Sequence, residues 1–133
     1  MTRQQIGSVI TAVAATGFLG TAALHTAGYS SVVRSSAQAP EMLRGLLPLL
    51  WLAVAFDLVV LGLIVAVVAL RPGGPARIIL AVAAICPLAA AGLQIRFIGF
   101  IPPTAILIGV AVVTLIGAIA LPPARVTPAG AAA

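Results

Sequence analysis

The chain has 133 residues, of which 62% are hydrophobic and 7% are charged, and its mean hydropathy is +1.27. Soluble domains typically carry about 25% charged residues, and a surface this poor in charge would not keep a protein dissolved in water. Composition therefore excludes a soluble protein and predicts a single all-α domain whose surface is solvated mainly by lipid.

The formal net charge is +5, and all seven basic residues are arginines. They stand singly between apolar runs, so no basic patch could follow a phosphate backbone. We therefore expect membrane lipids as partners and no nucleic acid. One histidine, one cysteine and two acidic residues are too few for an ordinary four-ligand zinc site, and the sequence contains no P-loop or GxGxxG motif. We expect neither a metal nor a cofactor.

Four stretches are long and apolar enough to cross a bilayer. A hydrocarbon core of about 30 Å requires about 20 apolar residues in a helix. The spans predicted on this basis are 6–25, 46–70, 78–95 and 104–121. They predict an integral membrane four-helix bundle with short connections over residues 1–121, followed by a disordered, Pro/Ala-rich tail at 122–133.

Prolines and glycines mark the ends of these spans. Pro40 followed by Glu41 is typical of a helix start, and Pro48 then marks a kink or a second start. The segment 71–75, Arg-Pro-Gly-Gly-Pro, cannot continue a helix and predicts a tight turn between the second and third spans. Pro102 suits the first turn of the fourth helix, where its missing N–H group costs nothing.

Arginines in the connections predict the orientation of the chain in the membrane. Four of them fall on the side of the N-terminus and three on the opposite side, which we call the outer side, so both termini are expected in the cytoplasm. An Ala/Val/Leu-rich chain with arginine as its only basic residue is typical of a GC-rich bacterium, which predicts a multi-pass protein of the bacterial inner membrane. The first group is Arg3, Arg71, Arg77 and Arg125, and the second is Arg34, Arg44 and Arg96.

Asp57 is the most informative residue for function. It lies eleven residues after Leu46, so about 16 Å into its span and close to the bilayer midplane. A charge at that depth costs about 3 kcal/mol, and an intramembrane acid indicates a functional site by default. We predict Asp57 as a catalytic residue that is either protonated or faces a partner or water inside the protein. The alternative is a protonated carboxyl group that only hydrogen-bonds to a neighbouring helix.

His25 is the second predicted catalytic residue. Gly17, Thr21, His25 and Tyr29 are spaced by four residues and share one helical face while the helix lasts. Because small residues favour close packing of helices in lipid, this face is expected to point inward and to carry His25 toward the bundle. The alternative is an interfacial histidine that meets only lipid headgroups.

Six further polar or aromatic residues fall near the outer ends of the spans, above Asp57. We predict them as ligand-binding residues of a polar vestibule that leads down to Asp57. These residues also have simpler interpretations. The two arginines extend to lipid phosphates, and Glu41 caps a helix or pairs with Arg44 three residues further along it. The rings of Tyr29 and Trp51 anchor the helices at the depth of the lipid headgroups. The six are Tyr29, Glu41, Arg44, Trp51, Gln94 and Arg96.

Three functions from different classes fit this pattern. The first is the binding or transformation of a lipophilic small molecule, such as proton-initiated cyclisation or isomerisation of an isoprenoid, which needs an acid in a water-poor apolar pocket. The second is a non-catalytic accessory or assembly subunit of a larger membrane complex, in which Asp57 pairs with a partner's helix. The third is a small proton-coupled transporter that works as a homo-oligomer with Asp57 as the carrier.

Overall fold

The structure, a computed structural model, describes residues 1–123, and this part of the chain is helical with no strand. Four helical segments are long and apolar enough to cross a membrane: Arg3–Ser36, Glu41–Leu70, Ala76–Phe97 and Pro102–Ala120. The predicted all-α bundle of four transmembrane helices is therefore confirmed, and the chain is a multi-pass membrane protein. Of the predicted disordered tail, all but Pro122 and Pro123 lies outside the described residues.

The turn residues end and begin helices where the sequence predicts. Helix α3 runs from Glu41 to Leu70 with Pro40 as its N-cap, and α4 begins at Ala76 after the 71–75 turn and ends at Phe97. Helix α5 starts at Pro102 and ends at Ala120. Pro48 lies inside α3 without ending it, since membrane helices tolerate an internal proline when neighbouring groups satisfy the freed backbone atoms. Helix α3 is therefore five residues longer at its start than the predicted span.

The first span also continues further than predicted. Helix α1 covers Arg3–Ala27, and α2 covers Tyr29–Ser36, where we expected a connection. Gly28 between them has φ −74° and ψ −9°, which is close to helical geometry, so the chain keeps its direction. Helix α2 packs beside the first half of α3. The predicted end at residue 25 was wrong because contact with α3 supports a segment whose own sequence is too polar to indicate a membrane helix.

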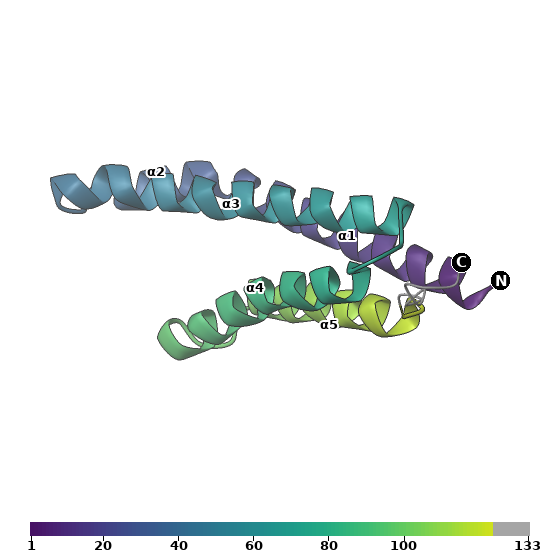
Figure 1. Cartoon of the computed structure of the whole chain (residues 1–133). Helices are drawn as coiled ribbons and strands as arrows, with labels where there is room; N and C mark the ends of the chain where they lie inside the picture. The colour runs from purple at the N-terminus through teal and green to yellow at the C-terminus, as the bar shows by residue number, and fades with distance from the viewer. Residues whose placement is uncertain (124–133) are drawn as a thin grey trace, which may run out of the picture.

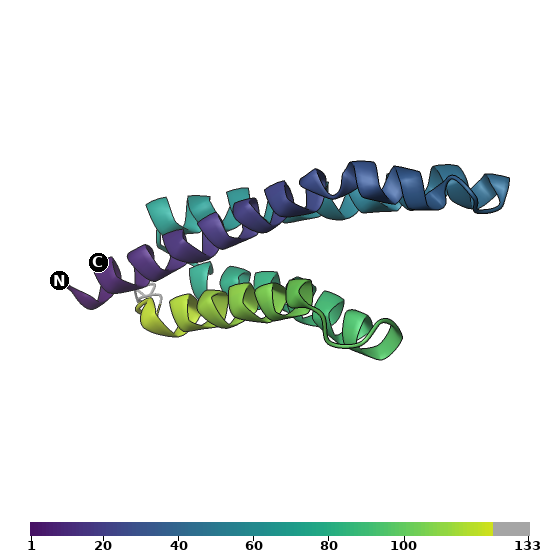
Figure 2. The ribbon, with the colours of Figure 1, turned by 180° about the vertical axis from the view of Figure 1, so that it is seen from behind.

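The helices form two pairs that meet at one end of the molecule and diverge toward the other. Helix α1 packs against both α3 and α5, and α4 packs against α5, while α3 and α4 contact each other little although a short turn joins them. We call the end with Met1, the 71–75 turn and Pro123 the proximal end, and the end with α2 and the 98–101 connection the distal end. Figures 1 and 2 show the α1–α3 pair and the α4–α5 pair separating toward the distal end.

The two pairs also differ in length. Helix α3 has 30 residues and so is about 45 Å long, whereas α5, with 19 residues, is about 28 Å long. A bilayer core is about 30 Å thick. Helices α2 and α3 therefore extend past the distal end of α4 and α5, as Figure 1 shows.

The backbones of α1 and α5 approach each other closely near the proximal end. Gly7 and Gly117 are buried, and an added Cβ atom would lie 2.9 Å from the backbone nitrogen of Leu121 at Gly7, and 2.9 Å from Thr11 Oγ1 at Gly117. Thr11 is itself fully buried, and its hydroxyl donates to the Gly7 carbonyl at 2.8 Å. Such contacts between small residues drive association of helices in lipid.

Two arginines from different helices bind the C-terminal end of α5. Arg3 donates from Nε to the Ala120 carbonyl at 3.3 Å and from Nη2 to the Ile119 carbonyl at 3.2 Å. Arg77 donates from Nε to the Ala118 carbonyl at 3.0 Å. The last carbonyls of a helix have no partner within the helix and carry the negative end of its dipole. These arginines, which the sequence indicated only as lipid anchors, therefore tie α1 and α4 to α5.

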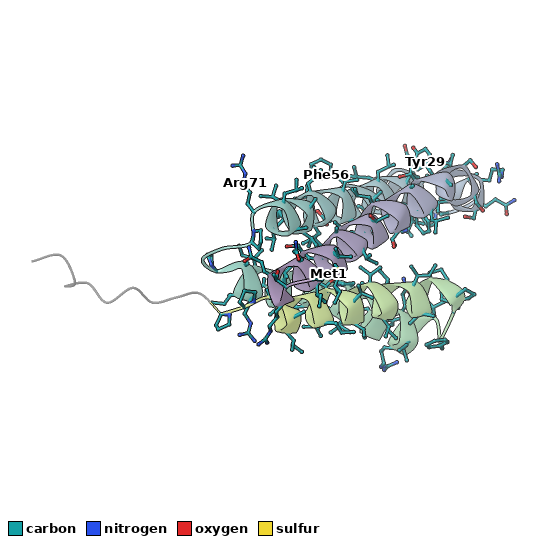
Figure 3. All side chains as sticks on the ribbon, turned by 90° about the vertical axis from the view of Figure 1, so that its right-hand side faces the viewer. Met1, Tyr29, Phe56 and Arg71 are labelled. Carbon is teal, nitrogen blue, oxygen red and sulfur yellow. The ribbon has the colours of Figure 1, made fainter. Side chains whose placement is uncertain are left out.

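We expect Arg77→Ala to lower the free energy of unfolding by about 1 kcal/mol, because it removes a charged donor from the α5 carbonyls. The measurement is SDS-induced unfolding of the purified protein in detergent micelles. Arg71→Ala is the control, because it deletes the same side chain in the exposed turn, where Figure 3 shows Arg71 pointing away from the helices. Equal losses in the two variants would show that the bond to Ala118 contributes nothing.

Candidate functional site

A cleft of about 810 Å³ lies between the two helix pairs in the distal half of the molecule. All five helices contribute to its lining, and most of the lining side chains are aliphatic. On α3 the lining residues recur every three or four positions from Leu47 to Leu61, so they occupy one face of that helix. The cleft exists because α1 holds the pairs together only toward the proximal end.

Asp57 lies on the cleft-lining face of α3, and its side chain is exposed there. It follows Trp51 by six residues on the same helix, so it lies about 9 Å deeper in the direction of the proximal end. The residues around it on this face, Val54, Leu58 and Leu61, are aliphatic. The structure thus places the predicted acid in an apolar cleft, while a catalytic role for it stays a prediction.

His25 and Trp51 form a stacked pair at the junction of α1 and α2. Their ring centroids are 3.8 Å apart and their planes differ by 11°. Trp51 Nε1 donates to the His25 carbonyl at 2.6 Å, which fixes the indole against the last turn of α1. Gly28 is required for this contact, because an added Cβ atom would lie 3.0 Å from Trp51 Cζ2.

The imidazole of His25 is the notable polar group of this pair. Both residues line the cleft, and His25 Nε2 is buried without a hydrogen-bond partner within residues 1–123. A buried polar atom without a partner costs about 1–3 kcal/mol, so such atoms in native proteins call for an explanation. Because Nε2 has almost no accessible surface, a ligand in the cleft would bond to it only if the ring turned toward the cleft.

Gln94 brings a third polar group to the cleft from α4. Its Oε1 accepts a hydrogen bond from the hydroxyl of Thr104 at 2.8 Å, and Thr104, in the first turn of α5, is fully buried. This bond links the end of α4 to the start of α5 and fixes the amide oxygen. The structure therefore brings Asp57, His25, Trp51 and Gln94 to one cleft, and their role in binding stays a prediction.

The other four predicted residues do not line the cleft. Tyr29 follows Gly28 at the start of α2, near the distal end in Figure 3. Glu41 and Arg44 are exposed in the first turn of α3. Arg96 is exposed and lies with Cζ 5.5 Å from the centroid of the Phe97 ring. The predicted vestibule thus has fewer members than expected, because only Trp51 and Gln94 of the six predicted residues line the cleft.

Several lining residues were not predicted. Ser35 and Ser36 reach the cleft from α2, which the sequence indicated as a connection. Thr21 was predicted only as a packing residue, yet it lines the cleft beside His25. Cys86 and Pro87 of α4 complete the deep part of the lining. The four-residue spacing of Thr21 and His25 could have predicted that both line the cleft from α1. The described part of the chain contains no group of three His, Cys, Asp or Glu residues that could hold a metal ion.

Comparisons of the chain with protein-family models, with curated proteins and with solved structures give no match.

Proposed function

We propose that this membrane protein binds a lipophilic small molecule in the cleft between its two helix pairs. One observation carries the proposal: an apolar cleft of about 810 Å³ contains the intramembrane acid Asp57. Ligand pockets typically measure about 300–1,000 Å³ and combine an apolar lining with a few polar groups that orient the ligand. The cleft has both properties.

The polar groups support a ligand better than they support packing alone. Asp57 points into the cleft instead of a helix–helix contact, and an acid at this depth is costly unless something meets it. His25 Nε2 likewise lacks a partner in the described chain. A lipophilic molecule with a polar end would occupy the apolar space and meet Asp57. Proton-initiated chemistry on an isoprenoid would use the same cleft with Asp57 as the acid, and it stays a hypothesis beyond binding.

The bilayer itself is the source we infer for the ligand. Helices α3 and α4 both line the cleft but contact each other little, so a lipophilic molecule can pass between them from the lipid. We also infer an orientation with the proximal end in the cytoplasm of a bacterium, which rests on the arginine bias of the sequence.

The test uses a neutral probe, tritiated geranylgeraniol, and scintillation proximity with the protein in phosphatidylcholine nanodiscs. Saturable binding is expected for the natural sequence. Ala90 lines the cleft and is half-buried, whereas its neighbour Ala89 is exposed and does not line it. Ala90→Phe should place a ring inside the cleft and reduce binding about tenfold or more, while Ala89→Phe should bind as the natural sequence does.

Either of two results would contradict the proposal. The first is equal binding by the Ala90→Phe and Ala89→Phe variants, which would place the probe in surrounding lipid. The second is no saturable binding at all, and it could be accompanied by co-purification of a membrane protein whose helix crosslinks to Ala90→Cys. That second result would favour the accessory-subunit hypothesis, in which a partner's helix fills the cleft.

A further inference from the structure

The charges around the cleft restrict what the ligand can be. Among residues 1–123, Asp57 is the only side chain lining the cleft that carries a formal charge at pH 7, where the imidazole of His25 is counted as neutral. The six arginines of residues 1–123 are all exposed elsewhere. Arg3 and Arg77 bind the α5 carbonyls at the proximal end, and Arg96 lies over Phe97. A carboxylate, phosphate or sulfate in the cleft would therefore find no cation in the part of the chain that the structure describes, and it would face Asp57.

The hydrogen-bonding groups of the lining also disfavour an anionic ligand. The hydroxyls that line the cleft already donate to carbonyls of their own helices: Thr21 to Gly17 at 2.7 Å, Ser35 to Ser31 at 2.9 Å and Ser36 to Val33 at 3.1 Å. A hydroxyl has one proton, so each of these oxygens can only accept a further bond. With the Asp57 carboxylate, they offer hydrogen-bond acceptors, whereas the donors of the lining, on Gln94, His25 and Cys86, are neutral.

We propose that the ligand is a lipophilic cation, an amphiphilic amine or quaternary onium compound whose charge is met by Asp57. This inference rests on the proposed function, because it names the chemical class that the same cleft would hold. An ionised carboxylate in an apolar site is costly unless it is paired, and a cation with an apolar body supplies the pair while it fills the cleft. The indole of Trp51, the ring that attracts cations most strongly, also lines the cleft.

The probes are two ions of the same shape and opposite charge, tetraphenylphosphonium and tetraphenylborate. The protein, in phosphatidylcholine nanodiscs, is loaded with tritiated geranylgeraniol, and each ion is titrated as a competitor. Direct binding of tritiated tetraphenylphosphonium is measured in parallel. We expect the cation to displace the neutral probe at a concentration about tenfold or more below that of the anion. The net charge of the chain is +5, so its overall field favours the anion, and a preference for the cation would have to arise locally.

Two variants test whether Asp57 causes the preference for the cation. Asp57→Asn should weaken tetraphenylphosphonium binding about tenfold or more and geranylgeraniol binding far less, because the asparagine amide oxygen still accepts a hydrogen bond from an alcohol. Circular dichroism checks that the variant is folded. Glu41→Gln is the matched control, because Glu41 is the other acidic residue of the chain and does not line the cleft. It should leave both probes unaffected.

The outcomes separate this inference from the proposed function. If geranylgeraniol binds and Ala90→Phe excludes it, but the two ions compete equally or Asp57→Asn changes neither, the cation assignment is wrong and the lipophilic site remains. If no probe binds saturably, both proposals fail. Repeating the cation titration in nanodiscs that contain phosphatidylethanolamine should give the same affinity. Loss of cation binding there would assign the site to a zwitterionic lipid, whose headgroup carries a phosphate beside its amine, and would overturn the proposal of a ligand with a net positive charge.

Discussion

Phe18→Ala should lower the free energy of unfolding by about 3 kcal/mol, the largest effect we expect from a single truncation in this chain. Phe18 is fully buried, and it lies at the contact of α1 with α3, where a Cβ atom on Gly62 would be 3.2 Å from Phe18 Cβ. Interior packing in lipid depends on van der Waals contact more than on exclusion of water. Removing the ring deletes its many close contacts at once and leaves a cavity.

The control for this truncation is Phe56→Ala. Phe56 lies on α3 with 67% of its surface exposed, and Figure 3 shows its side chain pointing outward from the helix pair. The same atoms are deleted there, but lipid takes their place, so a change within about 0.5 kcal/mol is expected. SDS-induced unfolding monitored by circular dichroism measures both variants. Similar losses at the two positions would mean that α1 and α3 do not pack through Phe18.

Gly117→Leu should destabilise the protein by about 3 kcal/mol through overpacking. An added Cβ atom at Gly117 would lie 2.9 Å from Thr11 Oγ1 and 3.5 Å from the Thr11 backbone. Thr11 cannot turn aside easily, because it is fully buried and its hydroxyl is bound to the Gly7 carbonyl. A leucine would therefore force α1 and α5 apart at the proximal end.

Gly109→Leu provides the comparison within the same helix. Nothing lies within 4 Å of a Cβ atom at Gly109, and this residue is exposed. Leucine is a better helix former than glycine by almost 1 kcal/mol in peptides, so this variant should be as stable as the natural sequence or slightly more so. Thermal unfolding in the same detergent compares the two. A Gly109→Leu variant as unstable as Gly117→Leu would refute the close contact of α1 with α5.

The contacts of α1 connect these stability effects to the cleft. Helix α1 is the element that packs against both α3 and α5, whereas α3 and α4 contact each other little. The spacing of the two helix pairs, and with it the width of the cleft, therefore depends on how α1 is held at the proximal end. A substitution smaller than Gly117→Leu, such as Gly117→Ala, is expected to alter the affinity for geranylgeraniol as well as stability, since α5 also lines the cleft.

The sequence by itself determined the class of protein and the order of its helices. Hydropathy at the length of a bilayer core identified four spans, and the residues Pro40, Pro102 and the 71–75 turn placed three helix boundaries to within a few positions. These features are local, because a missing N–H group or an apolar run acts on the chain wherever it occurs. The depth predicted for Asp57 rests on the same counting of residues along the helix.

Tertiary structure decided which polar residues meet. The sequence does not determine how each helix is rotated about its axis relative to its neighbours. It therefore could not distinguish Trp51 and Gln94, which line the cleft, from Arg44 and Arg96, which do not. Helix α2 forms because it packs beside α3, and only its formation brings two serines to the cleft. The cleft itself arises because α1 joins the two pairs while α3 and α4 barely touch. Those contacts join residues far apart in the chain, and no local pattern encodes them.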